Sequence, residues 1–383
     1  MPETGSARCP RIAIDTIPLL GRLTGVGHYI QELVHQFRRL SPQYDYSYYY
    51  GYFSKRILTG GKQISGLKDW LSKVPVVRDG LRGFGRAVAK YHPAEFDLYF
   101  EPNFIPLDIK ARNIVTTIHD FSFRLFPEAH PKDRLRYFSK NFLKNVRRSS
   151  AIITVSDHVM REAIDLLGIP AQVITPIHLG VNHDLFKTYP RDEQEMCRRE
   201  LGLPERFILF VGTREPRKNL SRLVQAYAEL PRLLQREFSL VLVGPRGWGE
   251  TDLAGGRKLG TRVTVLQYVS PQKLALIYNL ASALAYPSLY EGFGLPPLEA
   301  MACGCPVIVS RVASLPEVCA DAAYYISPTD TQDIADGINN VLCDNELRSS
   351  LVEKGFARAK LFAWEKTAKR TLEVFHQVLS EAG

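Results

Sequence analysis

The stretch SALAYPSLYEGFGLPPLEAMACGCPVIVS, residues 282–310, places two short apolar runs on either side of a loop rich in glycine and proline. The runs SALAYP (282–287) and PVIVS (306–310) have the length and composition of buried β-strands. Between them Pro297 suits the first position of a helix, so PLEAMA is predicted to be helical with Glu299 in its first turn. A strand, a helix and a further strand in this order are typical of a parallel sheet.

The same alternation continues along the chain. Runs of strand length, rich in β-branched residues, occur at 11–15, 96–100, 113–118, 151–156, 207–212, 239–244 and 262–269. Helical patterns such as NLSRLVQAYAEL separate most of them, which favours an α/β fold with doubly wound parallel sheets. Ligands of such sheets bind beyond the carboxyl ends of the strands, so the residues that follow each strand are the candidates for a site.

The chain is expected to divide near residue 188. At 383 residues it is too long for one ordinary core and suits two domains. The segment PIHLGVNHDLFKTYPRDEQE ends one strand–helix pattern with proline, glycine, asparagine and a charge run before the next strand begins. We expect domains at 1–188 and 189–360 that face each other across a cleft. The amphipathic segment 361–383 either closes the second domain or packs back on the first.

Composition indicates a globular protein of a reducing compartment. The six cysteines form no C-x-x-C pair and have no histidine at zinc spacing, so we expect reduced thiols. The beginning MPETGSARCPR lacks the apolar segment of a signal peptide, and no apolar run reaches the ~18 residues that span a bilayer. A cytoplasmic location is therefore expected.

The net charge of +9 is concentrated in residues 54–93, where nine Lys and Arg accompany two Asp. Such a region can face solvent or bind nucleic acid, anionic lipid or an acidic substrate. Apolar residues such as Leu67, Trp70 and Leu71 are interleaved with the basic ones, whereas stacking of single strands would need more aromatic residues. This pattern favours peripheral binding to the cytoplasmic face of the inner membrane, and nucleic acid is not an expected partner.

Cations follow the run FILFVG. Arg214, Arg217 and Lys218 lie within five residues, in TREPRKNL, ahead of a predicted helix start. A helix N-terminus next to Arg and Lys is typical of a phosphate site. Further along, the strand RVTVLQYVS ends near Tyr268 and Val269, where main-chain groups can bind a base.

Two glutamates bracket the loop of the opening stretch. Glu291 lies just past the predicted strand at 282–287, and Glu299 lies eight positions later. A carboxylate can accept two neighbouring hydroxyls, and a helix dipole favours one in the first turn. We therefore expect one glutamate to bind sugar hydroxyls and the other to bind a ribose.

The backbone between these glutamates is also a candidate. Gly292 and Gly294 free the chain, so that the amides near Phe293 and Leu295 can point at an anion.

The first half of the chain offers a second glycine-rich loop, TGVGHY at 24–29. It follows the first strand and opens a helix, so Gly25 and Gly27 can make room for a phosphate or an acceptor, with His28 beside them. A nicotinamide-dependent oxidoreductase would need a complete G-x-G-x-x-G here, and this sequence lacks it.

Further polar residues follow strands of the first half. His119 and Asp120, in TIHD, and Ser156, after AIITV, stand at predicted strand ends. We expect these residues to face the cleft.

Together these motifs resemble the retaining, nucleotide-sugar-dependent glycosyltransferases of family four, which have the GT-B fold of two Rossmann-like domains facing a central cleft. Their E-x7-E motif matches Glu291 through Glu299, and EGFGLPPLEAMACGCPVI is close to the family pattern. EPRKN matches their diphosphate-binding segment, and TGVGHY resembles the equivalent family loop. The likeness is densest from about residue 207 to 320.

The resemblance implies roles for individual residues. Arg217 and Lys218 would bind the diphosphate, Glu291 the hexose and Glu299 the ribose, while His119 would touch the transferred sugar or the reacting oxygen. The expected catalytic residues are His119, Arg217, Lys218 and Glu291. The expected donor site comprises Gly25, Gly27, Thr213, Arg214, Arg217, Lys218, Tyr268, Val269, Glu291, Gly292, Phe293, Gly294, Leu295 and Glu299. Acceptor or cleft contacts are expected from His28, Asp120 and Ser156.

The expected reaction transfers a hexose with retention of anomeric configuration. No D-x-D motif occurs, and Arg217 and Lys218 can stabilise the departing diphosphate, so we expect no metal and no other cofactor. The likeness to bacterial mannosyl- and rhamnosyltransferases favours GDP-mannose as donor and a lipid-linked glycan of O-antigen or exopolysaccharide as acceptor. GDP-rhamnose or a UDP-sugar remains the alternative donor.

Other functional classes have weaker support. A nucleic-acid-binding protein would rest only on the pI of 9.2. A sugar-nucleotide epimerase or a phosphorylase of the same fold is a third alternative, and the phosphorylase would need a lysine-bound pyridoxal, for which the sequence carries no specific signal.

Overall fold

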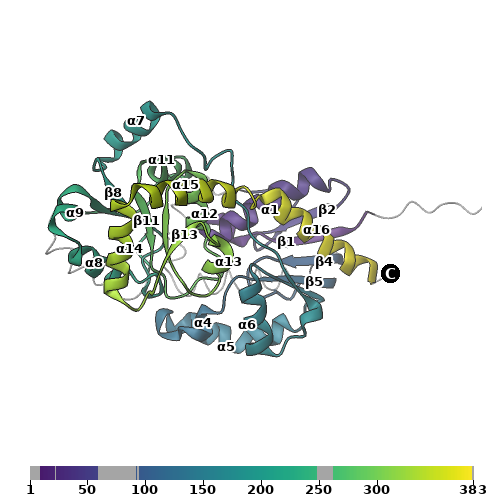
Figure 1. Ribbon diagram of the computed structural model, residues 1–383. Coiled ribbons are helices and arrows are strands. Elements are labelled where there is room, and N and C mark those ends of the chain that lie inside the picture. Colours follow the sequence, from purple (N-terminus) through teal and green to yellow (C-terminus); the bar gives the residue numbers. More distant parts are fainter. Residues whose placement is uncertain (1–8, 22, 59–91, 93–94, 248–261, 382–383) are drawn as a thin grey trace, which may run out of the picture.

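The computed structural model describes residues 9–21, 23–58, 92, 95–247 and 262–381. Two sheets lie side by side, the first in the N-terminal half and the second in the C-terminal half (Figure 1). The predicted α/β fold of two doubly wound domains is therefore confirmed.

The first sheet has seven strands, all parallel except the short β3 at its edge. Across the sheet the order is β3 (Phe53–Ser54), β2 (Asp45–Tyr49), β1 (Arg11–Asp15), β4 (Phe96–Glu101), β5 (Ala111–Ile118), β6 (Ala151–Thr154) and β7 (Ile174–Pro176). Its helices are α1 (Gly25–Leu40), α4 (Ser122–Leu125), α5 (Lys132–Val146) and α6 (Asp157–Leu167), with short 3-10 turns η1 (Ile17–Leu20), η2 (Pro127–Ala129) and η3 (Ala171–Val173).

The second sheet has six parallel strands. Their order is β10 (Val263–Leu266), β9 (Ser239–Val243), β8 (Phe207–Val211), β11 (Ala283–Tyr286), β12 (Val307–Ser310) and β13 (Ala323–Ile326). Its helices are α7 (Arg191–Leu201), α8 (Leu220–Glu229), α9 (Arg232–Glu237), α11 (Pro271–Leu280), α12 (Leu295–Ala302), α13 (Leu315–Cys319), α14 (Thr331–Cys343) and α15 (Asn345–Ala359), with the 3-10 turn η4 (Pro216–Lys218).

The central strands of the second sheet are buried along their whole length. Every residue of β8, β11 and β12 is buried, as expected for strands with helices on both faces. Their continuous apolar sequences thus place them at the centre, and the polar residues that follow them are left at the carboxyl edge.

Two crossing segments join the domains. The chain leaves the first sheet after β7 and returns at residues 361–364 into α16 (Trp364–Glu381), which packs on α1, β4, β5 and β6 of the first domain (Figure 1). The segments pair where Val181 N–H donates to Phe362 O at 3.3 Å. They also cross closely, because a Cβ on Gly180 would lie 2.2 Å from Trp364 N. In the part of the chain that the structure describes, no helix is long and apolar enough to cross a bilayer.

One helix boundary differs from the prediction. Helix α12 begins at Leu295, with a proline in its first two positions, rather than at Pro297. Glu299 therefore lies in the second turn, and the expected stabilisation by the N-terminal helix dipole is wrong. Either proline of the Pro296–Pro297 pair satisfies the preference for early helix positions, so the sequence signal alone does not fix the start.

Candidate functional site

A cavity of about 650 Å³ lies between the two domains at the carboxyl ends of β8 and β9. Its walls come from α1, from the crossing segment at 180–186 and from the strand ends of the second domain. The volume is typical of a site for a small ligand. Seven residues nominated from the sequence line it: Gly25, His28, Thr213, Tyr268, Val269, Leu295 and Glu299.

The two glycines at the start of α1 have different surroundings. A Cβ on Gly25 would meet nothing within 4 Å, so this position leaves open space in the cavity wall. A Cβ on Gly27 would instead lie 3.0 Å from Leu23 Cδ2. Gly27 is buried beside the Leu23 side chain, so local packing also accounts for this glycine, and the room it would make for a phosphate or an acceptor stays a prediction.

Next to this cavity lies a charged cluster, defined here as Glu215, Arg217, Lys218 and Glu291. Gly212 lines the cavity, and the Lys218 side chain lies next to it, because a Cβ added to Gly212 would be 3.7 Å from Lys218 Cε. Lys218 Nζ donates to Glu291 Oε1 at 2.5 Å, and Arg217 Nη1 donates to Glu291 Oε2 at 3.2 Å. The structure thus brings together three of the four residues expected to be catalytic.

Arg217 and Lys218 each have a further anchor in the second domain. Arg217 Nη2 donates to Glu215 Oε1 at 2.7 Å, and Arg217 Nη1 donates to Tyr290 O at 2.7 Å. Lys218 Nζ donates to the Tyr286 hydroxyl at 2.7 Å. Glutamates balance both cations, and these hydrogen bonds hold both side chains at the carboxyl edge of the sheet.

Burial and charge act in opposite directions on this cluster. Burial alone would raise the pKa of Glu291, but the positive charges of Lys218 and Arg217 outweigh it and lower the pKa to about 2. Burial lowers the pKa of Lys218, and Glu291 opposes that shift. For Arg217 the neighbouring carboxylates prevail over burial and raise the pKa. Glu291 is therefore an anion at neutral pH, committed to two cationic partners.

Arg214 offers a donor that the described residues leave without a partner. Its backbone N–H donates to Pro245 O at 3.1 Å, which ties it to the end of β9. The side-chain Nε is buried and has no hydrogen-bond partner among the described residues. Because an unpaired buried donor is costly, this nitrogen is suited to an anionic ligand at the strand end.

Glu299 is a carboxylate that lines the cavity from the second domain. The Tyr278 hydroxyl donates to Glu299 Oε2 at 3.0 Å. Burial raises the pKa of Glu299 to about 7, with the tyrosine opposing the shift. Glu299 thus changes charge near neutrality and presents hydrogen-bonding oxygens to the cavity.

The loop after β11 is where the domains meet. Ser156 Oγ, in the first domain, donates to Gly292 O at 2.8 Å and accepts from Val159 N–H at 3.1 Å. A Cβ on Gly292 would lie 1.9 Å from His119 O. Ser156 is fully buried with its hydroxyl engaged, so it positions the loop of Gly292 against the first domain.

Phe293 and Gly294 complete this loop. The Phe293 ring is buried and packs against His178 and Phe362, each with centroids 5.9 Å away. Gly294 has φ of 110°, a conformation that favours glycine, and caps the start of α12. Any ligand contact from Phe293 therefore comes from its backbone.

His119 and Asp120 lie at the carboxyl end of β5, beside this loop. His119 Nε2 donates to Pro102 O at 2.7 Å, so the proton of the neutral ring is on Nε2. Burial lowers the pKa of His119, with this hydrogen bond and Asp120 opposing the shift. Asp120 Oδ1 accepts from the backbone N–H and hydroxyl of Ser122 at 2.9 and 2.7 Å. These hydrogen bonds hold Asp120 just ahead of α4, which begins at Ser122, and His119 is a neutral imidazole beside Gly292.

A second contact between the domains involves Glu317 of α13. Glu317 accepts from the backbone N–H groups of Asp157 and His158 at 2.8 and 3.0 Å, and from His178 Nε2 at 2.6 Å. Asp157, His178 and Glu317 are close enough to hold a metal ion. The Glu317 oxygens, however, accept hydrogen bonds from the N-terminus of α6. The cluster of Asp157, His178 and Glu317 therefore connects the two domains.

Sequence reasoning missed the partners that hold the charged cluster. Glu215 is the first residue of the motif EPRKN, Tyr290 directly precedes EGFG, and Tyr286 ends β11. The Tyr290 hydroxyl accepts from Phe121 N–H at 3.0 Å, which links the cluster to the first domain. A position in or next to a motif was the signal that could have identified Glu215 and Tyr290.

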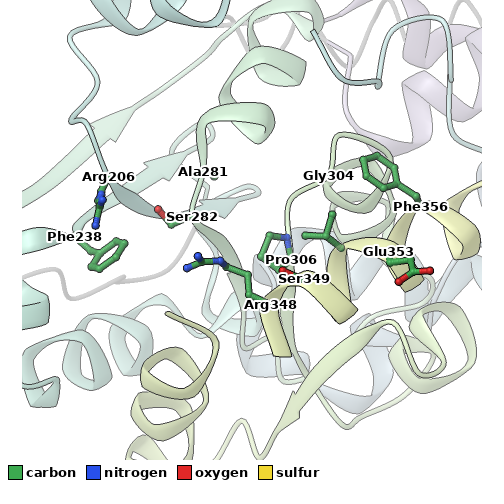
Figure 2. Close-up of a pocket in the computed structure, with 11 residues that line it drawn as sticks. Arg206, Phe238, Ala281, Ser282, Gly304, Pro306, Arg348, Ser349, Glu353 and Phe356 are labelled. Carbon is green, nitrogen blue, oxygen red and sulfur yellow. The ribbon is translucent and has the colours of Figure 1, made fainter. Parts of the chain in front are cut away.

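A second cavity, of about 680 Å³, lies at the opposite edge of the second sheet (Figure 2). Arg206, Ser282 and Pro306 line it, and each directly precedes a strand. Arg206 pairs with Glu237, and Arg348 Nη2 donates to Asn345 at 2.6 Å. Its described lining contains none of the residues nominated from the sequence.

Comparison with known proteins identifies the family to which this chain belongs. Residues 193–358 match the model described as glycosyl transferases group 1, and residues 23–185 match the model described as glycosyltransferase family 4. The chain is 33% identical to the O-antigen chain mannosyltransferase B of Escherichia coli, over 95% of this chain and 99% of that protein. The chain is a family 4 glycosyltransferase.

Further relatives agree with this assignment. The glycosyltransferase is 30% identical to the O-antigen chain mannosyltransferase RfbU of Salmonella typhimurium (strain LT2), over 62% of each protein. Among solved structures, sucrose-phosphate synthase from Thermosynechococcus elongatus has a TM-score of 0.71 at 20% identity, covering 98% of this chain and 100% of that one. WaaG, a glycosyltransferase involved in lipopolysaccharide biosynthesis, has a TM-score of 0.71 at 17% identity, covering 95% and 99%. These structures confirm the GT-B fold.

Proposed function

We propose that this glycosyltransferase moves mannose from GDP-mannose to a growing, lipid-linked glycan of cell-surface polysaccharide, with retention of anomeric configuration. The observation that carries the proposal is the 33% sequence identity to an O-antigen chain mannosyltransferase over almost the whole length of both chains. The cavity between the domains, with the charged cluster beside it, supports a nucleotide sugar as the donor.

In the proposed mechanism Arg217 and Lys218 bind the diphosphate at the carboxyl edge of the second sheet. Negative charge develops on the departing diphosphate, and fixed cations in a buried site stabilise it without reorganising. The unpaired Arg214 Nε adds a third donor at the same edge. Since these cations meet the electrostatic need, we propose that transfer requires no metal ion.

Retention is proposed to follow a same-face path. A covalent glycosyl-enzyme would need a carboxylate free to attack the anomeric carbon. Glu291 is instead paired with Lys218 and Arg217, which favours a role in binding the hexose. The leaving phosphate would then take the proton of the acceptor hydroxyl, while the neutral His119 ring lies near the reacting oxygen. Closure of the domains would exclude water.

A thermal-shift panel tests the donor. We expect GDP and GDP-mannose to raise the melting temperature, and UDP, dTDP and ADP compounds to raise it less. At a hundredfold excess over Kd the stabilisation is about 2.7 kcal/mol. The shift with GDP should persist in EDTA, because cations of the protein bind the diphosphate. No shift with any nucleotide sugar would contradict the proposed function.

We also propose that the protein works at a membrane surface. Most of the basic region predicted at 54–93 lies outside the described residues. Helix α5 carries a second basic region, the α5 basic face, where Lys132, Arg136, Lys140 and Lys144 are exposed at helical spacing. The exposed Asp133 shares this face and pairs with Arg136 at 3.1 Å, so four cations outweigh one carboxylate. Leu125 at the end of α4 and Tyr137 on α5 are 40% and 38% exposed. Basic residues with exposed apolar neighbours suit an anionic bilayer.

Vesicle co-sedimentation tests this surface. The variant R136E/K140E/K144E should bind vesicles containing phosphatidylglycerol at least about 10²-fold more weakly, because each lost basic residue removes ~1 kcal/mol near an anionic surface and each new carboxylate adds repulsion. Pure phosphatidylcholine vesicles should bind neither protein strongly.

The matched control reverses three exposed basic residues on another helix, K366E/K369E/R370E on α16. If both triple variants lose vesicle binding equally, binding depends on net charge and the α5 basic face has no special role.

A further inference from the structure

One face of α1 forms the wall of the cavity that the first domain contributes. His28, Gln31, Glu32 and His35 recur at helical spacing and line it. Asn182 Nδ2 donates to Glu32 Oε1 at 3.0 Å. Glu32 thus presents a carboxylate to the cavity from a position fixed by the crossing segment.

The cavity corresponds to the nucleoside end of the proposed donor. Glu291, the proposed hexose ligand, is not among the residues that line it, whereas Glu299, the proposed ribose ligand, is. A series of contacts leads from Glu299 toward α1. Tyr278 donates to Glu299, and the Phe186 ring lies 6.0 Å from the Tyr278 ring. Phe186 belongs to the same segment as Asn182, the partner of Glu32.

The rest of the lining suits a planar ring. Leu185, Phe186, Val269 and Leu274 contribute apolar surface, and Tyr268, 61% exposed, contributes an aromatic side chain. Apolar and aromatic side chains of this kind can contact the faces of any base, so selection among bases requires a polar group at the ring edge.

We propose that Glu32 selects guanine as the base of the donor, held for this purpose by Asn182; the inference rests on the proposed nucleotide-sugar donor. Guanine carries two adjacent donors, N1–H and the 2-amino group, which a carboxylate can accept together. Uracil presents a single N–H between two carbonyl oxygens, whose lone pairs face the carboxylate unfavourably. Adenine has an unprotonated N1 beside its amino group. Attraction to one base and repulsion of another together give specificity.

Competition binding with GDP, IDP and UDP tests the assignment, because IDP differs from GDP only by lacking the 2-amino group. The wild-type protein should bind GDP about tenfold or more tightly than IDP. In Glu32→Gln the GDP-to-IDP ratio should fall toward unity, with GDP affinity reduced about 10- to 100-fold and UDP affinity not reduced. Asn182→Ala should lower the same ratio less, as a positioning residue. The matched control is Glu373→Gln, at an exposed position of α16, which should keep the wild-type ratio.

The outcomes separate this inference from the proposed function. An unchanged GDP-to-IDP ratio in a folded Glu32→Gln protein that still transfers mannose overturns the role of Glu32 and leaves the proposed function standing. Stronger wild-type binding of UDP than of GDP, equally strong in the variant, also overturns guanine selection by Glu32. Failure of the wild-type protein to bind any nucleotide or nucleotide sugar overturns the proposed function itself.

Discussion

Replacing Lys218 with alanine is expected to lower kcat for mannosyl transfer about 10²- to 10³-fold, because the variant loses a fixed cation aimed at the departing diphosphate. The side chain is 11% exposed and lies between Glu291 and the Tyr286 hydroxyl, so no other described lysine can take its place. Release of GDP with time, measured with saturating donor, gives kcat directly. The matched control is Lys354→Ala, which removes an exposed lysine paired with Asp321, and should retain the wild-type rate.

The same substitution also destabilises the fold, so loss of activity has to be separated from loss of structure. Removing one partner of a buried ion pair costs about 3–5 kcal/mol of unfolding free energy. The double variant K218M/E291Q leaves no unbalanced buried carboxylate and should recover part of that stability while staying inactive. A double variant that is stable and fully active would show that the pair serves folding alone.

The pH dependence of stability offers an independent check of this pair. Glu291 has a pKa lowered from 4.5 to about 2 in the folded protein, so its pairing stabilises the native state fully above about pH 4.5. That contribution is lost as pH falls from 4.5 toward 2. K218M/E291Q should therefore lose less unfolding free energy than the wild type on acidification through this range.

Much of the fold could be predicted because its central strands are uniformly apolar. FILFV and SLVLV became β8 and β9 with nearly the predicted bounds. Strand β2, DYSYY, was missed because tyrosines and polar residues give no apolar run, and only the packing of Tyr46 and Tyr48 in the core reveals it. Strand β10 ends at Leu266, earlier than the apolar run suggested.

The candidate site, like the fold, could be predicted only in part. Glu291 and Lys218 could be nominated because each stands in a motif at a strand end, where the geometry of parallel sheets brings such residues together. Their separation in sequence is 73 positions, and the partner Tyr286 is 68 positions from Lys218. Pairings of this kind depend on strand order, which local patterns do not encode. Gly27 shows that a glycine in a motif can also have a packing contact, here with Leu23, which the motif alone does not reveal.

Replacing Gly292 with alanine is the second substitution with a large expected effect. The added Cβ would lie 1.9 Å from His119 O and 2.9 Å from Asp120 Cβ, both in the other domain. The obstacle is backbone, which cannot rotate away, and Gly292 has no positive φ that would strain an alanine by itself. The substitution should therefore force the domains apart at this loop and weaken the Ser156–Gly292 hydrogen bond.

A displacement of about 1 Å at a reacting centre can cost about 10²-fold in rate, and we expect kcat of Gly292→Ala to fall by at least that factor. Donor binding should suffer less, because the proposed contacts of Arg217, Lys218 and Glu299 belong to the second domain, and the proposed guanine contact of Glu32 is the one that a wider separation would weaken. The control is Gly21→Ala, where an added Cβ meets nothing within 4 Å and activity should be unchanged. Comparing kcat with the Kd for GDP separates the two effects. A wild-type kcat in Gly292→Ala would mean that turnover does not require the domains to approach as closely at this loop as they do in this structure.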